Sequence, residues 1–456
     1  MKTLLLNPPK HLRGIYVCRE ENGIGEVDCD FLPSNIYLAA PYLREMGKDV
    51  DALDAETPVV SLDGYDVVVV WVCILHSFYE DIQLLKGAKE EGKRTVMVLN
   101  DAHEGLEMEA MQRFDFIDAS IRLWEREVAL GRLLSSWEED EYPDLPGVIY
   151  RKDGKLVDTG RMPYLPDVEH LPSCSGILSE VSLKRYGAAA ITTGRGCPMP
   201  HSFCLYSRTG LRRRKVEDVV AEIEAVSSVG RVMIMDPSMP TTAQWRDALC
   251  DQLIARKIRV SWRTDAKLQQ CNAGTLKKLK AAGCDSIMLA VETLNADVKG
   301  KVKGGTSHQR LKTGIENIKR AGMVPIPVFF IGFPWDSSET LAEIDAFLRE
   351  VAVPSFILKQ VRPWRGTTLY QDCKELGLLE RDLGIDGYVH SDNPVVDTLY
   401  LSRDEIMEWK YRMRRDAILN WRYIRSFLFE RRRVTLRQAG LFLRLAAGRK
   451  GGWDGN

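Results

Sequence analysis

Short apolar runs alternate with amphipathic stretches over the first 150 residues. Five runs predict strands, at residues 3–6, 49–54, 66–73, 94–100 and 116–123. The run 66–73, DVVVVWVC, is almost continuously apolar and therefore indicates a strand that is buried on both faces. Helical spacing of apolar residues predicts helices over 34–46 and 78–92. This alternation is typical of α/β proteins with a Rossmann-like, doubly wound parallel sheet.

A second alternating series follows between residues 188 and 361. It predicts strands at 188–193, 232–236, 258–262, 286–292, 325–331 and 356–361. Helices are expected between them at 216–228, 242–256, 272–282, 307–321 and 337–351. Six strand–helix units make a partial, TIM-like (β/α)6 barrel, in which the loops that follow the strands carry the chemistry.

Between and after these two series the pattern changes. Three prolines, Pro163, Pro166 and Pro172, mark a linker, and residues from about 402 to 450 have a helical and basic pattern. We therefore expect a Rossmann-like domain over 1–160, a linker over 161–185, a partial barrel over 186–385 and a helical, basic C-terminal region over 386–456.

Composition narrows the class of protein. The chain has 456 residues and a formal net charge of −1, which argues against nucleic acid as a partner. The N-terminal apolar run is too short for a signal peptide or a membrane span, so we expect a cytoplasmic protein. Its ten cysteines are then expected to be free thiols. Aromatic residues among the basic residues 410–450 add the alternative of peripheral contact with a membrane surface.

One segment carries candidate metal ligands. Residues 194–204 read GRGCPMPHSFC and place three soft or borderline donors, Cys197, His201 and Cys204, at short spacing after the first strand of the second series. Such a set can hold an iron–sulfur cluster through three of its irons and leave the fourth open to a small molecule. A histidine stands where a third cysteine is expected.

The segment resembles the signature of the radical S-adenosylmethionine superfamily, C-x-x-x-C-x-x-C within the context R-G-C-P…C-x-F-C. Further likenesses follow in order, in G-C-D…A-V-E at 283–292, in F-I-G-F-P at 330–334 and in P-W-R-G-T-T-L-Y at 363–370. The resemblance implies a [4Fe-4S] cluster on Cys197, His201 and Cys204. It also implies S-adenosylmethionine near Phe203, Asp236, Glu292 and Gly332.

An α/β domain ahead of such a barrel resembles the cobalamin-binding, mostly methyltransferase subgroup of that superfamily. The first strand ends in N-P-P, as in that subgroup, whereas its D-x-H-x-x-G motif is missing and its G-E-x-E stretch is reduced to Leu123-Trp124-Glu125-Arg126-Glu127. The resemblance implies a cobalamin site at the loops after the strands. Its candidate residues are Asn7, Cys73, His76 and His103.

His201 leaves three interpretations open. It ligates iron and the chemistry proceeds, it ligates iron and the cluster only binds S-adenosylmethionine, or the cluster is labile or absent. An imidazole donates less charge than a thiolate and raises the potential of a cluster, which works against reductive cleavage of S-adenosylmethionine.

The resemblance implies an enzyme that methylates an unactivated carbon of a small natural product or lipid. Cobalamin and S-adenosylmethionine would be its cofactors, and a flavodoxin or ferredoxin its electron donor. The alternatives are a cobalamin-assisted radical cyclase or rearrangement enzyme, and a degenerate member that binds a substrate or partner without cleaving S-adenosylmethionine. No catalytic residue can be assigned from the sequence.

Overall fold

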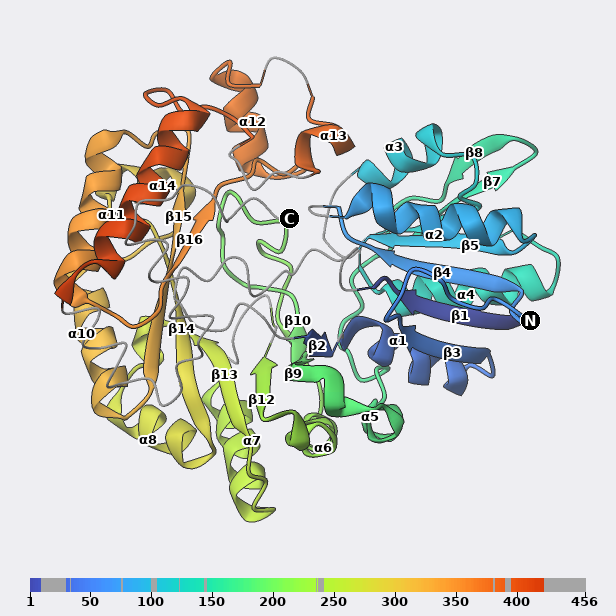
Figure 1. The fold of residues 1–456 in the computed structure, drawn as a ribbon, viewed down its shortest axis with the longest axis horizontal. Helices are drawn as coiled ribbons and strands as arrows, with labels where there is room; N and C mark the ends of the chain where they lie inside the picture. The colour runs from blue at the N-terminus through green and yellow to red at the C-terminus, as the bar shows by residue number, and fades with distance from the viewer. Residues whose placement is uncertain are drawn as a thin grey trace.

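The structure, a computed structural model, describes residues 1–9, 30–32, 34–74, 77–99, 105–122, 124–142, 146–234, 236, 242–379, 382–389 and 395–421. Within these residues the strands form two seven-stranded sheets and a two-stranded ribbon. Figure 1 shows the first sheet with its helices on one side of the molecule and the second sheet with its helices on the other.

The first sheet has the strand order β3-β1-β4-β5-β6-β7-β8. Its first five strands run parallel, and β7 and β8 form an antiparallel hairpin at one edge. The strands are β1 (Lys2–Asn7), β3 (Asp49–Asp54), β4 (Val67–Val72), β5 (Arg94–Leu99), β6 (Ala119–Ile121), β7 (Val148–Lys152) and β8 (Lys155–Asp158).

Helices cover both faces of this sheet. Val67 and Val69 of β4 pack in one core with α1 (Ser34–Glu45) and α4 (Arg126–Glu138). Val68 and Val70 point the other way, into a second core with α2 (Phe78–Glu90) and α3 (Leu106–Arg113). Because both faces are buried, the strand is apolar at every position, and the predicted doubly wound sheet is confirmed.

The second sheet has the order β16-β15-β14-β13-β12-β9-β2, and all its neighbours are parallel. Its helices lie outside the curve of the strands (Figure 1), which confirms the predicted partial barrel. The strands are β2 (Asp30–Leu32), β9 (Tyr186–Ile191), β12 (Arg231–Ile234), β13 (Ser261–Ala266), β14 (Cys284–Glu292), β15 (Val324–Ile331) and β16 (Ile357–Gln360). The helices between them are α6 (Val216–Ala225), α7 (Ala243–Ala255), α8 (Ala273–Ala281), α9 (Ala296–Val302), α10 (His308–Arg320) and α11 (Ser338–Val351).

The pattern analysis missed or displaced a few elements. The strand expected at 258–262 lies instead at Ser261–Ala266, because buried polar residues such as Arg263 and Thr264 interrupt its apolar pattern. The strand expected at 116–123 is shortened to β6. The apolar pattern did not predict β2. This strand comes from the N-terminal part of the chain but pairs with β9 in the second sheet.

The two halves share one hydrophobic core. It runs from α1 and α4 through α5 (Ser175–Glu180), within the predicted linker, to α6 and the strands of the second sheet. The chain then continues through α12 (Thr368–Glu375), α13 (Ile385–Tyr388) and α14 (Arg403–Ile418). Of these, α13 returns to the first half, where Ile385 and Tyr388 join the core beneath α2. The domain boundaries given above stay predictions.

None of the described helices combines the length and apolar character needed to cross a membrane. Most of the basic stretch 410–450 lies outside the described residues, which end at 421. Its contact with a membrane surface therefore stays a prediction.

Candidate functional site

The candidate ligands lie on one loop that a short ribbon closes. The ribbon follows β9 and consists of β10 (Gly194–Arg195) and β11 (Arg212–Arg213), paired antiparallel. The residues between its strands, 196–211, include Cys197, His201 and Cys204, and we call them the cluster loop.

Two glycines allow the ends of this loop to approach each other. Gly196 has φ +84°, and a Cβ atom built on it would lie 1.6 Å from the carbonyl oxygen of Gly210. A Cβ on Gly194 would lie 2.4 Å from the carbonyl oxygen of Arg212. The backbone amide of Cys197 then donates to Oγ1 of Thr209 at 3.0 Å. The G-R-G part of the motif thus serves to bring two backbone segments into contact.

The three donors are largely shielded from water. Cys197 is buried, and Cys204 and His201 are partly buried. Burial raises the pKa of the Cys204 thiol to about 11. Burial, followed by the charge of Lys267, lowers the pKa of His201 and so favours the neutral imidazole that can ligate a metal.

The donor set fits an iron–sulfur cluster. Thiols and imidazole suit iron or zinc by their chemistry. Among the described residues, however, only Glu125, Glu127 and His170 bring three ligand atoms within 4.8 Å of one another, so the loop donors are spread more widely. The donors are thus not arranged around one shared ion; what fits a cluster is their chemical type, since in a cluster each donor binds a different iron.

Glu292, at the end of β14, lies against His201. The β14–β15 register shifts between Ala290 and Glu292, and Glu292 has φ +59°, a left-handed conformation that is unusual for this residue type. Its Oε1 lies 3.8 Å from Nε2 of His201, and its Oε2 accepts a hydrogen bond from the Gly305 amide at 3.0 Å. Burial raises the pKa of Glu292 to about 7.

The other residues predicted to contact S-adenosylmethionine lie around the same end of the barrel. The Phe203 ring stacks on the His201 ring at 5.2 Å between centroids. Asp236 accepts a hydrogen bond from the Thr193 amide at 2.7 Å and pairs with Arg213 at 2.7 Å, so its carboxylate braces the start of the ribbon. Gly332 has φ +88°, and its amide donates to Asp336 at 2.9 Å.

Two of the residues predicted to contact cobalamin are described. Asn7 ends β1 and Cys73 follows β4, at the two strands where the order of the parallel sheet reverses. Ligands of open α/β sheets bind at such a switch point. The Asn7 side chain donates to Asp54 at 2.5 Å, and the Cys73 amide donates to Asp81 at 2.8 Å. His76 and His103 lie outside the described residues.

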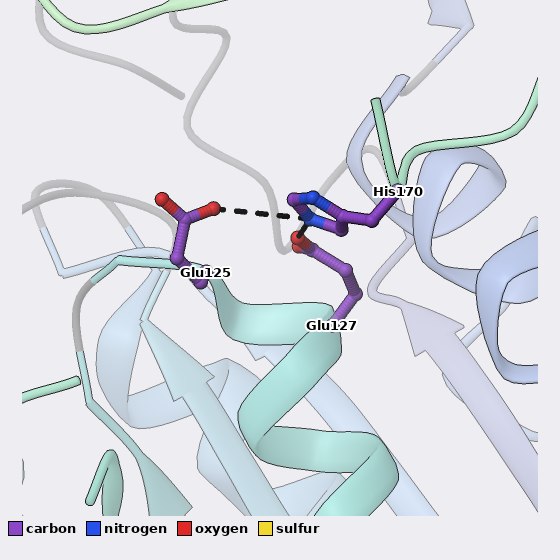
Figure 2. Close-up of side chains that lie close together, drawn as sticks. All are labelled: Glu125, Glu127 and His170. Carbon is purple, nitrogen blue, oxygen red and sulfur yellow. Dashed lines mark hydrogen bonds and ion pairs between the residues drawn. The ribbon is translucent and has the colours of Figure 1, made fainter. Parts of the chain in front are cut away.

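A group of charged residues at the junction of the two halves was not assigned from the sequence. Glu125, Glu127 and His170 converge there (Figure 2), and the Nε2 atom of His170 lies 2.9 Å from Oε1 of Glu127. Arg195, two residues before Cys197, binds both carboxylates. The two closely spaced glutamates after the fifth predicted strand were a signal for this group, but their partners are distant in sequence.

A recess lies beside this group. It has a volume of about 80 Å3 and is in part open to solvent. Leu205, which directly follows Cys204, contributes to its wall, so the recess reaches the cluster loop. The other lining residues come from the first half, the linker and the segment after β16, and are Glu107, Arg122, Trp124, Arg161, Tyr164 and Gly366. Ligand sites often lie between domains, but typical ones enclose roughly 300–1,000 Å3, so this recess is small for a ligand.

Residues 191–348 match the model of the Radical SAM superfamily. This part of the chain, which carries the cluster loop, is a radical SAM domain, as the motif and the barrel landmarks predict.

Two curated relatives have a methyltransferase name. An uncharacterised methyltransferase of Pyrococcus horikoshii is 21% identical over 308 residues, which cover 65% of this chain and 66% of the relative. The bacteriochlorophyllide d C-8(2)-methyltransferase of Chlorobaculum tepidum is 22% identical over 204 residues, which cover 41% of this chain and 44% of that protein. The chain thus spans less than two thirds of the length of either relative.

The two-part fold also occurs in solved structures. The radical S-adenosylmethionine methyltransferase TsrM from Kitasatospora setae, solved with cobalamin and a [4Fe-4S] cluster, superposes with a TM-score of 0.66 at 17% identity, over 82% of this chain and 78% of that one. The cobalamin-dependent radical enzyme OxsB, solved with aqua-cobalamin and S-adenosylmethionine, gives 0.61 at 16% identity, over 90% of this chain and 61% of that one. Both matches extend well beyond the radical SAM domain.

Proposed function

We propose that this chain is a cobalamin-dependent radical S-adenosylmethionine methyltransferase that acts on an unactivated carbon of a small natural product or lipid. One observation carries the proposal. Three soft donors lie on a loop at the junction of a radical SAM domain and an open parallel sheet, in a fold shared with two enzymes that bind cobalamin.

The residues of the cluster loop suit the first cofactor. Cys197, His201 and Cys204 would hold the cluster, and the stacked Phe203 ring fixes the plane of the imidazole. Glu292, held by the Gly305 amide, and the backbone around Gly332 would face bound S-adenosylmethionine. The cluster, when bound, would supply the electron for cleavage of S-adenosylmethionine, and cobalamin would carry the methyl group.

The first sheet suits the second cofactor by its topology. Its switch point lies between β1 and β4, and Asn7 and Cys73 mark the carboxyl ends of those strands. The recess beside Leu205 lies between residues of the first half and the cluster loop, and it would have to widen to admit a ligand. A flavodoxin or ferredoxin would serve as the electron donor, and the basic C-terminal region would contact a membrane if the substrate is a lipid.

One observation favours a second candidate function. A partly buried imidazole, whose lowered pKa favours its neutral form, stands where the superfamily motif has a thiolate. This exchange raises the potential of a cluster and opposes reductive cleavage. A protein that binds S-adenosylmethionine and a substrate or partner without cleaving the cofactor is therefore the alternative.

Anaerobic reconstitution tests the proposal. The protein is incubated with iron, sulfide and hydroxocobalamin, desalted, and assayed for bound metal and for corrin absorbance. We expect about four irons and four sulfides per chain. With S-adenosylmethionine and titanium(III) citrate we expect 5′-deoxyadenosine, and the Cys197→Ala and Cys204→Ala variants should lose both the iron and this product. Retained iron without 5′-deoxyadenosine supports the second candidate, whereas no iron in either the wild type or the His201→Cys variant rules out the radical methyltransferase.

A further inference from the structure

The ribbon that closes the cluster loop holds two like charges side by side. Arg195 of β10 and Arg212 of β11 are directly opposite each other in the register of the pair. Like charges at directly opposed positions destabilise a strand pair. A ribbon with two residues in each strand has few hydrogen bonds to offset this repulsion. The loop therefore depends on anionic groups from elsewhere in the chain.

Those groups come from the other half of the molecule. Glu127 of α4 binds Arg195 through two bonds, from Nη1 at 2.7 Å and from Nη2 at 2.9 Å. Glu125, which precedes α4, accepts from Nη1 of Arg195 at 2.8 Å and also binds Arg212. A bidentate contact of this kind fixes both the distance and the orientation of the guanidinium group.

The carboxylates are buried, so these contacts are strong. Burial alone would raise the pKa of Glu127, but the charge of Arg195, with hydrogen bonds from His170 and Arg195, holds that pKa far below its ordinary value. Arg212 donates a further bond to the carbonyl oxygen of Leu165 in the linker, at 2.9 Å. Three segments of the chain thus meet at the base of the cluster loop.

Glu125, Glu127 and His170 also have the spacing of a metal site (Figure 2). The two guanidinium groups already balance the two carboxylates, however, and they bind the oxygen atoms that a cation would need. The arrangement is therefore better suited to hold arginine than a divalent ion.

A second contact joins the same segment to the far end of the loop. Trp124 has φ +79° and Glu125 has φ +42°, two successive left-handed residues of which neither is glycine. The Trp124 ring lies 4.7 Å from the Tyr164 ring and 5.1 Å from the ring of Tyr206, two residues beyond Cys204. A strained backbone that persists in a fold is held by its surroundings and often marks a functional segment.

We propose that Glu125 and Glu127 are positioning residues for the cluster loop. Through Arg195 and Arg212 the N-terminal sheet holds the base of the loop closed, so the spacing of the three metal donors depends on the cobalamin-binding half of the molecule. The part of this inference that concerns the cluster rests on the proposed function, whereas the part that concerns the loop does not.

Hydrogen exchange in the metal-free, full-length chain tests the loop directly. In Glu127→Gln and in Glu125→Gln/Glu127→Gln we expect amides of residues 196–211 to exchange roughly tenfold faster or more, while β14 and β15 keep their protection. Arg195→Lys keeps the charge but loses the bidentate contact, so it should show a smaller increase. This milder variant keeps the test valid if the double variant does not fold.

A buried ion pair that involves neither Arg195 nor Arg212 provides the control. The side chains of Arg214, which directly follows β11, and Glu222 of α6 are about 1% exposed and form an equivalent bidentate contact. Glu222→Gln should lower the melting temperature without selectively increasing exchange in 196–211. The proposal would be overturned if the amides of 196–211 exchanged at the wild-type rate in Glu127→Gln. An equal increase in exchange across the whole barrel would also overturn it.

Electron paramagnetic resonance of the cluster distinguishes a role in positioning the metal donors from a role in stabilising the fold alone. After reconstitution, the reduced cluster of Glu127→Gln should give an electron paramagnetic resonance spectrum with shifted g-values, whereas Glu222→Gln should match the wild type. Faster exchange with an unchanged spectrum would mean that the contact only braces the fold, which contradicts a positioning role. Failure of the wild type to bind iron would count against the proposed function. The hydrogen-exchange result would remain valid, because it is measured on the metal-free chain.

Discussion

The Nε2 atom of His201 lies 3.8 Å from Oε1 of Glu292, in a contact that joins the cluster loop to the end of β14. This distance is too long for a hydrogen bond. Burial lowers the pKa of His201 and raises that of Glu292 to about 7, so the contact is not a pair of full charges. The contact thus places one ring nitrogen of the imidazole beside the carboxyl group without a hydrogen bond between them.

The His201→Cys variant should have a more strongly reducing cluster than the wild type. A thiolate donates more charge than an imidazole, so the midpoint potential should fall, by roughly 100 mV or more. Potentiometric titration followed by electron paramagnetic resonance measures this shift, and the yield of 5′-deoxyadenosine should rise with it. His201→Ala, which supplies no third donor, is the control and should bind less iron than either. Equal potentials for the wild type and His201→Cys would show that His201 does not ligate iron.

Replacement of Glu292 separates its structural contact from its predicted cofactor contact. Glu292→Gln keeps an oxygen acceptor for the Gly305 amide, so the free energy of unfolding should change by less than about 1 kcal/mol. Its affinity for S-adenosylmethionine, measured by equilibrium dialysis of the reconstituted protein, should fall roughly tenfold. Glu292→Ala should in addition lose about 1–3 kcal/mol of stability, because the Gly305 amide is left without its acceptor. If both variants bind S-adenosylmethionine with wild-type affinity, Glu292 does not contact the cofactor.

Two glycines at the ends of the cluster loop form a matched pair for mutation. Gly196→Ala should cost about 3 kcal/mol or more and abolish iron binding, because its Cβ would lie 1.6 Å from a backbone oxygen. Gly210 also has a positive φ, of +68°, but no atom lies within 4 Å of its Cβ position. Gly210→Ala should therefore cost only about 1–2 kcal/mol and retain iron. Thermal unfolding and iron analysis measure both effects, and similar losses in the two variants would contradict the role given to the close approach.

Asp336 should make the stability of the protein depend on pH in an unusual direction. Burial raises its pKa to about 6, although the Phe333 and Gly332 amides and Thr340 donate to it. A raised pKa means that the folded state binds the proton more tightly, so the contribution is fully present below about pH 4 and is lost as pH rises through about 6. The loss should approach about 3 kcal/mol.

Urea denaturation of wild type and Asp336→Asn between pH 4 and 7.5 measures this dependence. The stability of the wild type relative to the variant should decline over that range. Glu339→Gln is the control, since the pKa of exposed Glu339 is lowered and its contribution disappears as pH falls rather than as it rises. Parallel curves for wild type and Asp336→Asn would contradict the prediction.

Much of the fold follows from local pattern. The strands β3 and β14 and the helices α8, α10 and α11 lie within two residues of their predicted bounds. The helices combine an apolar period with a clear start, such as the Ser337 cap of α11. The three metal donors were identifiable for a similar reason, since they lie within eight residues of one another in a motif whose glycines and proline dictate a turn.

Local sequence is enough to predict the two alternating series, the order of their elements and the loop that carries Cys197, His201 and Cys204, because these depend on contacts between near neighbours in the chain. The surroundings of that loop depend instead on how the whole chain packs. Glu292 reaches His201 only because β14 ends beside the loop, and Glu127 reaches Arg195 only because the two halves share a core. Pairings between residues so far apart leave no periodic trace in the sequence, since any buried arginine can be balanced by many different carboxylates and only the packed fold selects one.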